Sequence, residues 1–376
     1  MMRHLAAPRA RATVAGLATA VLVMGTAGAA LAQSPAASSG AAAHPELAGQ
    51  TLVVSNWAAY MPDDLPALFE AEYGVPVTVT THATNEDVVG KVAAGNSGID
   101  VAFLSGQFAQ ALGQAGYLSQ IDHALIPNLA NLYPEASELT YDPGNTVSVP
   151  YSWGTTGLCY RADLTGYDPD SWYDLLTPKE NVSGKTTALA TQRWLMLPAQ
   201  KALGFSANTV DPAEMEQVKE LLLAAKPTLL AYDDTTFYSR LVSGEASLVE
   251  AWDGWCNYAI GDKDQGANVK WVVPKEGSDL WVDTMTILED SPNKEAAHAF
   301  IDFVLRPEVQ AWVVDNISYK VPNQAAMALV SPKTLAAFPN LNMTPAELLA
   351  GEGLVDLGDE GAALYQTISD EILATQ

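Results

Sequence analysis

Strand-like runs alternate with helical patterns along the first part of the chain, and this alternation limits the folds open to it. Residues 51–55, 75–81 and 98–104 are rich in β-branched and apolar residues over lengths typical of strands. Helical patterns follow the first two runs, one over 62–74 and one after a capping-box sequence at 84–87. Strands that alternate with helices are typical of βαβ units and a parallel sheet. The sequence therefore predicts an α/β fold.

The same alternation resumes after an extended crossing segment at 145–153. A second set of strands and helices fills 155–273, and a further strand and an amphipathic helix follow at 280–288 and 293–305. A chain of 376 residues is too long for one hydrophobic core of ordinary size. We therefore expect two lobes, each a mostly parallel sheet flanked by helices, joined by crossing strands. The expected boundaries are 49–150 plus 275–322 for the first lobe and 151–274 plus 323–376 for the second.

The first 32 residues have the pattern of a secretory signal peptide. Arg3, Arg9 and Arg11 precede an apolar stretch that ends in an A-x-A pattern, with cleavage expected after Ala32. The stretch approaches the length of a membrane span, but its small residues and the cleavage pattern favour a signal peptide. Residues 33–48 are a low-complexity leader that we expect to be disordered. The sequence thus predicts export to the periplasm.

The net charge and the spacing of the histidines indicate which kinds of ligand and partner the chain can bind. The net charge of −25 repels nucleic acid and anionic lipid and favours cationic ligands. A solvated acidic surface explains the same count, so the charge alone selects no function. The five histidines form no pair at metal-ligand spacing. We therefore expect no nucleic acid, no metal and no cofactor.

Cys159 and Cys256 are the two cysteines of the chain. An exported protein meets an oxidising compartment, where a disulfide can form. The sequence does not show whether the two Cα atoms approach within bonding range. A disulfide and two free thiols both remain open.

Aromatic residues recur beside polar or acidic residues near the ends of the predicted strands. Trp57 and Tyr60 follow the first strand, and Trp281 precedes Asp283. A tryptophan face attracts a cation by about 0.5–2 kcal/mol, and a carboxylate accepts the hydrogen bond of an ammonium. Because α/β sheets bind ligands beyond the carboxyl ends of their strands, these positions predict a cation-binding cleft. The alternative is that each ring belongs to the core. The other such positions are Tyr151, Trp153, Trp194, Trp252, Asp253, Trp255 and Tyr319.

Seven short motifs occur in one order between Thr51 and the C-terminus. They are Ser55-Asn56-Trp57-x-x-Tyr60, Thr84-Asn85-Glu86, Val149-Pro150-Tyr151-x-Trp153-Gly154, Trp252-x-Gly254, WVVPKEG at 271–277 followed by Trp281-x-Asp283, LRPEV at 305–309, and Tyr319-x-x-Pro322-Asn323. In these motifs the chain resembles the spermidine/putrescine-binding proteins of bacterial ABC transporters, which belong to the extracellular solute-binding proteins of the periplasmic-binding-protein type II kind.

The resemblance implies a two-lobe clamshell that closes on a small ligand and delivers it to a permease in the inner membrane. It implies a monomer without catalytic activity, and a putrescine- or spermidine-type amine as ligand. Asp283 is implied to pair with an amine nitrogen, and Ser105 to supply a polar contact. The aromatic residues implied to line the cleft are Trp57, Tyr60, Trp252, Trp281 and Tyr319.

The chain departs from this family at positions where relatives that take spermidine carry charge. Ala58-Ala59 stands where those relatives have Thr-Glu, and Thr191 and Trp194 stand near second-lobe positions that are acidic in the family. Up to three carboxylates are thus absent from the expected cleft. Asp253, beside Trp252, is the first candidate to replace them, followed by Glu250, Asp233 and Asp234.

These departures leave other ligands open. Arg193, beside Trp194, could clamp a carboxylate through two parallel hydrogen bonds, which favours an ω-amino acid or a betaine. A quaternary ammonium compound is a further alternative. A different class of protein, a secreted α/β hydrolase, requires a nucleophile and a base within hydrogen-bond reach.

Overall fold

The computed structural model describes residues 44–374. The predicted signal peptide, its cleavage site and most of the predicted leader lie outside these residues. The leader was predicted to extend to residue 48, which is too far, because Pro45–Leu47 forms the short helix η1. The Leu47 side chain is buried and the His44 ring stacks on Tyr73. Apolar contacts with the first lobe thus order the end of this segment.

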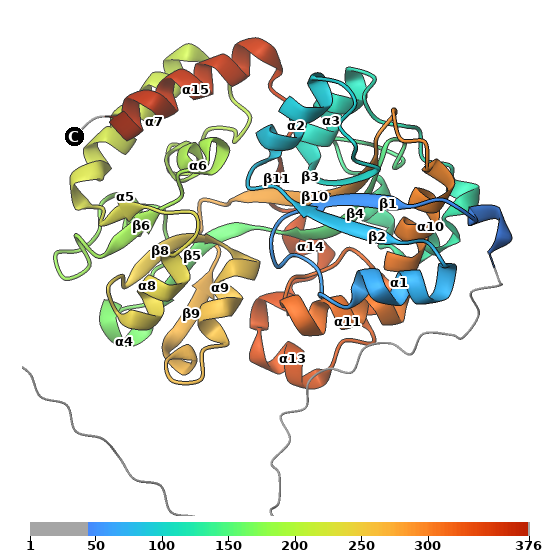
Figure 1. Cartoon of the computed structure of the whole chain (residues 1–376). Coiled ribbons are helices and arrows are strands. Elements are labelled where there is room, and N and C mark those ends of the chain that lie inside the picture. The colour runs from blue at the N-terminus through green and yellow to red at the C-terminus, as the bar shows by residue number, and fades with distance from the viewer. Residues whose placement is uncertain (1–43, 375–376) are drawn as a thin grey trace, which may run out of the picture. The chain divides into compact units, whose positions relative to one another are not determined.

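The first lobe is built on a six-stranded mixed sheet in the order β11-β10-β3-β1-β2, with β4 also paired to β10 (Figure 1). β1 pairs in parallel with β2 and β3, and β10 pairs in parallel with β11 but antiparallel to β3 and β4. The strands are β1 (Leu52–Asn56), β2 (Val77–Thr81), β3 (Val101–Ser105), β4 (Ser148–Gly154), β10 (Asp279–Ile287) and β11 (Glu352–Gly353).

Helices cover both faces of this first-lobe sheet. One face packs on α2 and α3, and the other on α1 and the helices that follow β10 (Figure 1). The predicted capping box at the start of α2 is confirmed, because Thr84 and Asp87 exchange side-chain and backbone hydrogen bonds. The helices are α1 (Leu65–Tyr73), α2 (Asn85–Ala93), α3 (Gly106–Gln114), α10 (Lys294–Val304) and α11 (Pro307–Ile317).

The second lobe is built on a five-stranded mixed sheet in the order β7-β6-β8-β5-β9. β5 pairs antiparallel with β8 and β9, whereas β6 pairs in parallel with β7 and β8. Its strands are β5 (Thr156–Arg161), β6 (Thr186–Ala188), β7 (Ala231–Tyr232), β8 (Leu248–Trp252) and β9 (Val269–Val272). Its helices are α6 (Gln192–Ala202), α7 (Pro212–Ala225), α8 (Phe237–Ser243), α9 (Asp253–Ile260) and the C-terminal α15 (Gly358–Ala374), which packs on α6 and α7.

The two sheets confirm the predicted α/β organisation with two lobes, and the crossing segments explain why both sheets are mixed. β4 leads directly into β5 of the other sheet, and β10 returns from β9. A third crossing runs from α14 (Pro345–Leu348) through β11 to α15. The sequence-based boundary placed all residues after 322 in the second lobe, but α12 (Gln324–Met327) packs on α11 of the first lobe.

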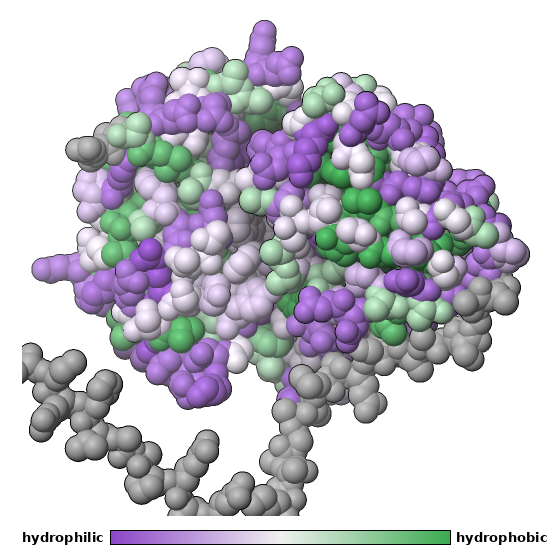
Figure 2. All heavy atoms as spheres, viewed as in Figure 1, coloured by the Kyte–Doolittle hydropathy of each residue, from purple (hydrophilic) through white to green (hydrophobic). Residues whose placement is uncertain are grey.

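A disulfide links Cys159 of β5 to Cys256 of α9 within the second lobe, with 5.8 Å between their Cα atoms. This settles the alternative that the sequence left open. Figure 2 shows a face on which polar residues prevail and apolar residues form separate patches. None of the helices in the described part of the chain combines the length and apolar character that a membrane crossing requires.

Candidate functional site

The turn after β1 places two aromatic rings at the carboxyl end of the first-lobe sheet. Asn56 accepts a hydrogen bond from the Trp57 backbone N–H at 2.8 Å through its Oδ1 atom. Ala59 has a φ of 57°, in the left-handed region that L-residues rarely adopt. The turn brings the rings of Trp57 and Tyr60 into an edge-to-face contact at 5.5 Å between centroids. Ala58 and Ala59 are exposed, so the rings alone face inward from this turn.

Asp283 lies at the centre of this first-lobe group. It sits opposite Ser105 in the antiparallel pairing of β10 with β3. The Tyr60 hydroxyl donates to its Oδ2 atom at 2.7 Å, and the Ser105 hydroxyl donates to its Oδ1 atom at 2.8 Å. Asn85, at the start of α2, fixes Ser105 by accepting its backbone N–H at 2.9 Å. The family resemblance had implied Asp283 and Ser105 as site residues, whereas Asn85 was named only as part of the Thr84-Asn85-Glu86 motif, without a role in the site.

The electrostatics of Asp283 are those of a carboxylate held without a cation. Burial raises its pKa to about 6, although the Tyr60 and Ser105 hydroxyls favour the ionised form. Within the described chain, no Lys or Arg forms an ion pair with this carboxylate. Burial also raises the pKa of Tyr60 well above its ordinary value. Tyr60 therefore remains a hydroxyl donor to Asp283 at neutral pH.

Further rings continue the wall from Tyr60 toward the second lobe. Tyr319 contacts Tyr60 edge to face at 4.9 Å, and Trp281 contacts Tyr319 at 6.1 Å. Tyr319 lies against Gly254 at the start of α9, where a Cβ atom would overlap its ring. A residue with a side chain at position 254 would therefore push Tyr319 away. First-lobe rings thus reach a second-lobe backbone directly.

Asp253 stands beside these rings as the acidic residue of the second lobe. The Oδ1 atom of Asp253 and the Trp281 ring both pack directly over Gly154. A Cβ atom at this glycine would overlap both of them. Burial raises the pKa of Asp253 to about 8. The backbone N–H of Gly254 donates a hydrogen bond to the Asp253 carboxylate and opposes this rise. Asn340 donates to its backbone carbonyl at 3.0 Å. Asp253 therefore joins the same group of residues as Trp281 and Tyr319.

Trp194 and Trp252 form a second aromatic pair, at 5.3 Å between centroids. The Trp194 indole N–H donates to the Oδ2 atom of Asp279 at 2.8 Å. Asp279 is the first residue of β10, two residues before Trp281. Trp194 thus contacts the first residue of the strand that carries Trp281 and Asp283, and Trp252 packs against Trp194.

Arg193 is buried in a different environment. Its guanidinium donates to the carbonyls of Val355 and Ala207 and to the Asn208 side chain, at 2.6–3.1 Å. None of its hydrogen bonds in the described chain reaches the group around Asp283. The structure therefore does not bring Arg193 together with the aromatic residues, and its contacts explain it as a support of the C-terminal segment.

The other candidate carboxylates have different surroundings. Asp233 pairs with Arg240 and with Thr236, as a structural ion pair does. Asp234 accepts the hydroxyl of Thr191 at 3.0 Å. Glu250 is fully buried; its Oε2 atom accepts the Leu189 N–H at 2.9 Å, and its Oε1 atom has no partner among the described residues. Burial raises the pKa of Glu250 well above its ordinary value.

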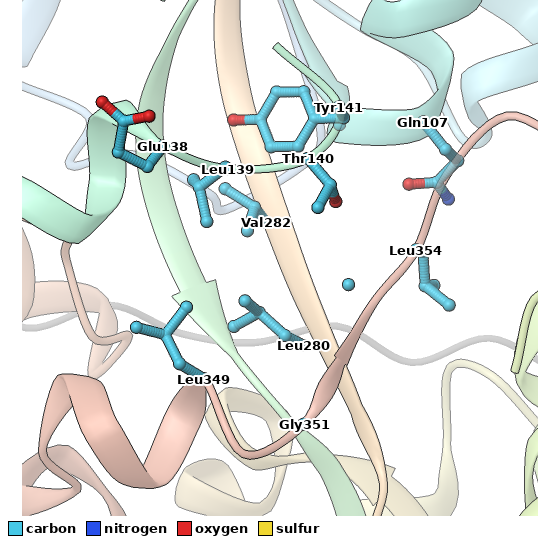
Figure 3. Close-up of a pocket in the computed structure, with 12 residues that line it drawn as sticks. Gln107, Glu138, Leu139, Thr140, Tyr141, Leu280, Val282, Leu349, Gly351 and Leu354 are labelled. Carbon is cyan, nitrogen blue, oxygen red and sulfur yellow. The ribbon is translucent and has the colours of Figure 1, made fainter. Parts of the chain in front are cut away.

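A cavity of about 160 Å³ lies against the other face of β10, and no sequence motif pointed to it (Figure 3). Leu280 and Val282 line it, and they alternate along the strand with Trp281 and Asp283, whose side chains leave the opposite face. Figure 3 shows the amide of Gln107 beside Leu354 at its edge. The Nε2 atom of Gln107 is buried and has no hydrogen-bond partner within the described chain.

One serine and one histidine lie within hydrogen-bond reach, as a hydrolase requires. Ser55 Oγ and His82 Nδ1 are 2.9 Å apart, and burial lowers the pKa of His82 to about 4. The other ring nitrogen of His82 has no carboxylate partner among the described residues, whereas a catalytic triad orients its base in this way. Ser55 is fully buried in β1, between β2 and β3. The His82 ring instead packs against Trp57 at 4.8 Å and supports the aromatic wall.

Comparison with known proteins assigns the family. Residues 65–341 match the family model described as bacterial extracellular solute-binding protein. The chain belongs to this family. It is 33% identical to the putrescine/agmatine-binding protein of Pseudomonas aeruginosa, over 84% of this chain and 88% of that one. It is also 33% identical to the spermidine/putrescine-binding periplasmic protein of Salmonella typhimurium, over 86% and 92% of the two chains.

Solved structures agree with this family assignment. A putative spermidine/putrescine ABC transporter protein from Listeria monocytogenes superimposes with a TM-score of 0.79 at 26% identity, covering 86% of this chain and 99% of that one. The substrate-binding protein of a spermidine/putrescine ABC transporter from Streptococcus pneumoniae gives a TM-score of 0.75, also at 26% identity and with the same coverage. The extracellular solute-binding proteins thus account for both the sequence motifs and the two-lobe fold.

Proposed function

We propose that this solute-binding protein captures a small aliphatic amine of the putrescine or spermidine type and delivers it to an ABC permease. The observation that carries the proposal is Asp283. This carboxylate is half-buried, accepts two hydroxyl hydrogen bonds and lies among aromatic rings without a cationic partner in the described chain. A buried charge without a partner is costly, and a ligand ammonium supplies that partner.

The aromatic wall suits the rest of such a ligand. The faces and edges of Trp57, Tyr60, Trp281 and Tyr319 offer flat apolar surface to methylene groups and tolerate positive charge. Asp253 is the second carboxylate of the same group, next to Trp281. Two carboxylates joined by rings match the two ammonium groups of a short diamine. The names of the relatives in Pseudomonas and Salmonella support the same ligand class.

The mechanism we propose is closure of the two lobes around the amine. Trp57, Tyr60 and Asp283 belong to the first lobe, whereas Trp252 and Asp253 belong to the second. A ligand that contacts both lobes stabilises the closed arrangement over the open one by its difference in affinity for the two. We propose that the protein does this as a monomer in the periplasm, after removal of the signal peptide, and that it catalyses no reaction.

Titration calorimetry and thermal shift with a panel of amines test this proposal. The panel contains putrescine, spermidine, choline, a betaine and γ-aminobutyrate, because these separate a diamine from a quaternary ammonium and from a zwitterion. A ligand at a hundredfold excess over its Kd stabilises the protein by about 2.7 kcal/mol, which a melting curve detects. Binding of a zwitterion with no response to putrescine or spermidine contradicts the proposal.

A single substitution then locates the site. Asp283→Asn keeps the shape and one of the two acceptor oxygens but removes the charge. We therefore expect putrescine to bind about a hundredfold more weakly, as loss of one partner of a desolvated charge pair usually costs about 2–5 kcal/mol. Asp63→Asn, at an exposed position of the same lobe, is the matched control and is expected to change nothing. Equal affinity in both variants removes Asp283 from the site.

A further inference from the structure

The third crossing between the lobes, at residues 349–357, is bonded to both of them. On the first-lobe side, β11 pairs in parallel with Asp279 and Leu280 of β10. The backbone N–H of Asp356 donates to the Gln110 side chain of α3 at 2.8 Å. After the crossing, α15 packs on α6 and α7 of the second lobe. A change in the angle between the lobes therefore acts on this segment.

The Glu352 carboxylate of β11 is the main tie to the second lobe. It accepts hydrogen bonds from the Lys201 ammonium, the Ser206 hydroxyl, the Ala207 backbone N–H at 2.8 Å and the Asn208 amide at 3.1 Å. All four donors come from the end of α6 and the loop that follows it. Partial burial opposes the charged form, but these donors hold the pKa of Glu352 at about 2.

Neighbouring bonds hold the backbone of the crossing to the same loop. The Asn208 amide donates to the Gly353 carbonyl at 2.9 Å, and its Oδ1 atom accepts the Val355 N–H at 3.1 Å. Arg193 donates to the Val355 carbonyl at 2.9 Å. Arg193 thus helps to hold the crossing segment to the second lobe, and this role explains why its side chain is buried.

The tie is connected to the strand that carries the candidate site. β11 pairs with the first two residues of β10, and Trp281 and Asp283 follow in the same strand. The helix that ends near Lys201 also carries Trp194, which donates to Asp279. An opening that draws the end of α6 away from β10, while β11 stays paired with β10, breaks the charge-assisted hydrogen bonds to Glu352, which are about twice as strong as neutral ones.

We infer that Glu352 is a latch that holds the second lobe to the first-lobe sheet in the arrangement seen here, and that it acts as a positioning residue for ligand capture. The effect on ligand affinity rests on the proposed function, whereas the effect on the lobes does not. Loss of the latch moves the ligand-free population toward open arrangements. Because the competent population becomes smaller, the apparent affinity falls by the same fraction.

Distance measurements between the lobes test the latch without any ligand. Spin labels on Glu86→Cys in α2 and Glu220→Cys in α7 occupy exposed positions, one in each lobe. The two native cysteines are joined in a disulfide, so labelling is selective. In the Glu352→Gln and Lys201→Met variants, we expect the distance distribution of the ligand-free protein to shift toward a more open population. Glu360→Gln, an exposed acid near the start of α15, is the matched control.

The double variant and the affinity complete the test. Glu352→Gln combined with Lys201→Met is expected to open the lobes by less than the sum of the two single changes, because both remove the Lys201–Glu352 ion pair, whereas Glu352→Gln also weakens the other three hydrogen bonds. Putrescine affinity is expected to fall about tenfold in each single variant. Unchanged distance distributions in the single variants overturn the latch, even if the variants melt at lower temperature. If the wild type binds no amine, the proposed function fails, while the distances still decide the latch.

Discussion

Ala59 adopts its left-handed conformation in the turn that brings Trp57 and Tyr60 together, and an alanine there is strained. A glycine at this position relieves the strain but loses more entropy on folding, by roughly 0.5–1 kcal/mol. At Ala58, whose φ is not positive, a glycine has only the entropic cost. We therefore expect Ala59→Gly to be about 1 kcal/mol more stable than Ala58→Gly in urea unfolding. The reverse order would show that the turn is relaxed.

The pH dependence of amine binding follows from Asp283. Burial raises its pKa to about 6, so the ligand-free carboxyl is increasingly protonated below pH 6 and charged above it. A raised pKa means that the folded, ligand-free protein loses stability as pH rises from about 4, the ordinary pKa of Asp, to about 6, and an ammonium relieves that cost. Burial raises the pKa of Asp253 to about 8, so this second carboxyl must also lose its proton to meet an ammonium across this range. We expect putrescine affinity to rise from pH 5 to pH 7, more steeply below pH 6, where both carboxyls titrate, than above it.

Calorimetry at these three pH values checks this, with Asp283→Asn as the control. The asparagine variant binds more weakly and is expected to keep only the part of the rise that Asp253 causes, without the extra steepness below pH 6. His82, with a pKa of about 4, does not titrate between pH 5 and pH 7. A wild-type affinity that is flat from pH 5 to pH 7 would mean that Asp283 does not meet the ammonium.

Close packing at the start of α9 gives a prediction at the scale of elements. A Cβ atom at Gly254 overlaps the Tyr319 ring, so Gly254→Ala has to move either the ring or the helix. We expect putrescine affinity to fall at least tenfold, since small displacements of positioning groups are costly. Gly90→Ala in α2 is the matched control: its Cβ meets no atom within 4 Å, and alanine favours a helix. If calorimetry shows unchanged putrescine affinity for Gly254→Ala, Tyr319 does not contribute to the ligand site.

The sequence predicted the parts of the site that are encoded locally. The strand–turn pattern placed Trp57 and Tyr60 at the end of β1. The family resemblance implied Asp283, within a motif, and Ser105, at a matching position outside the motifs, and the structure brings the two together. The partners of Arg193 were not predictable, because Val355 lies 162 residues away and nothing in the local pattern shows which way a helix start faces.

The cavity and the third crossing escaped prediction for a similar reason. β11 has two residues, too few for an alternating pattern, and its pairing with β10 joins segments far apart in the chain. Glu352 and Gln107 look like ordinary surface residues in the sequence, since most charged and amide side chains are exposed. Only the packing of the lobes shows that one accepts four hydrogen bonds and that the other lines a cavity.

At the scale of the whole molecule, removal of the disulfide is expected to lower stability without abolishing ligand binding. Cys159 and Cys256 close a loop spanning 97 residues of the second lobe, and cross-links of this length constrain the unfolded chain by roughly 4–5 kcal/mol in the entropic model. Neither cysteine contacts Asp283 or the rings of the wall through the interactions described above. A Cys159→Ala/Cys256→Ala variant is therefore expected to unfold at lower urea concentration, with a loss of about 2–4 kcal/mol.

Amine binding is expected to survive in the folded variant, because the partners of Asp283 come from β3 and from the turn after β1 in the first lobe. The wild type under reducing conditions provides the control, since it should unfold like the variant once the bond is open. Calorimetry at 15 °C, well within the folded range, then compares affinities without interference from unfolding. A large loss of affinity would mean that the bond positions α9, and with it Asp253, for the ligand; unchanged stability would mean that the bond restrains little of the unfolded chain.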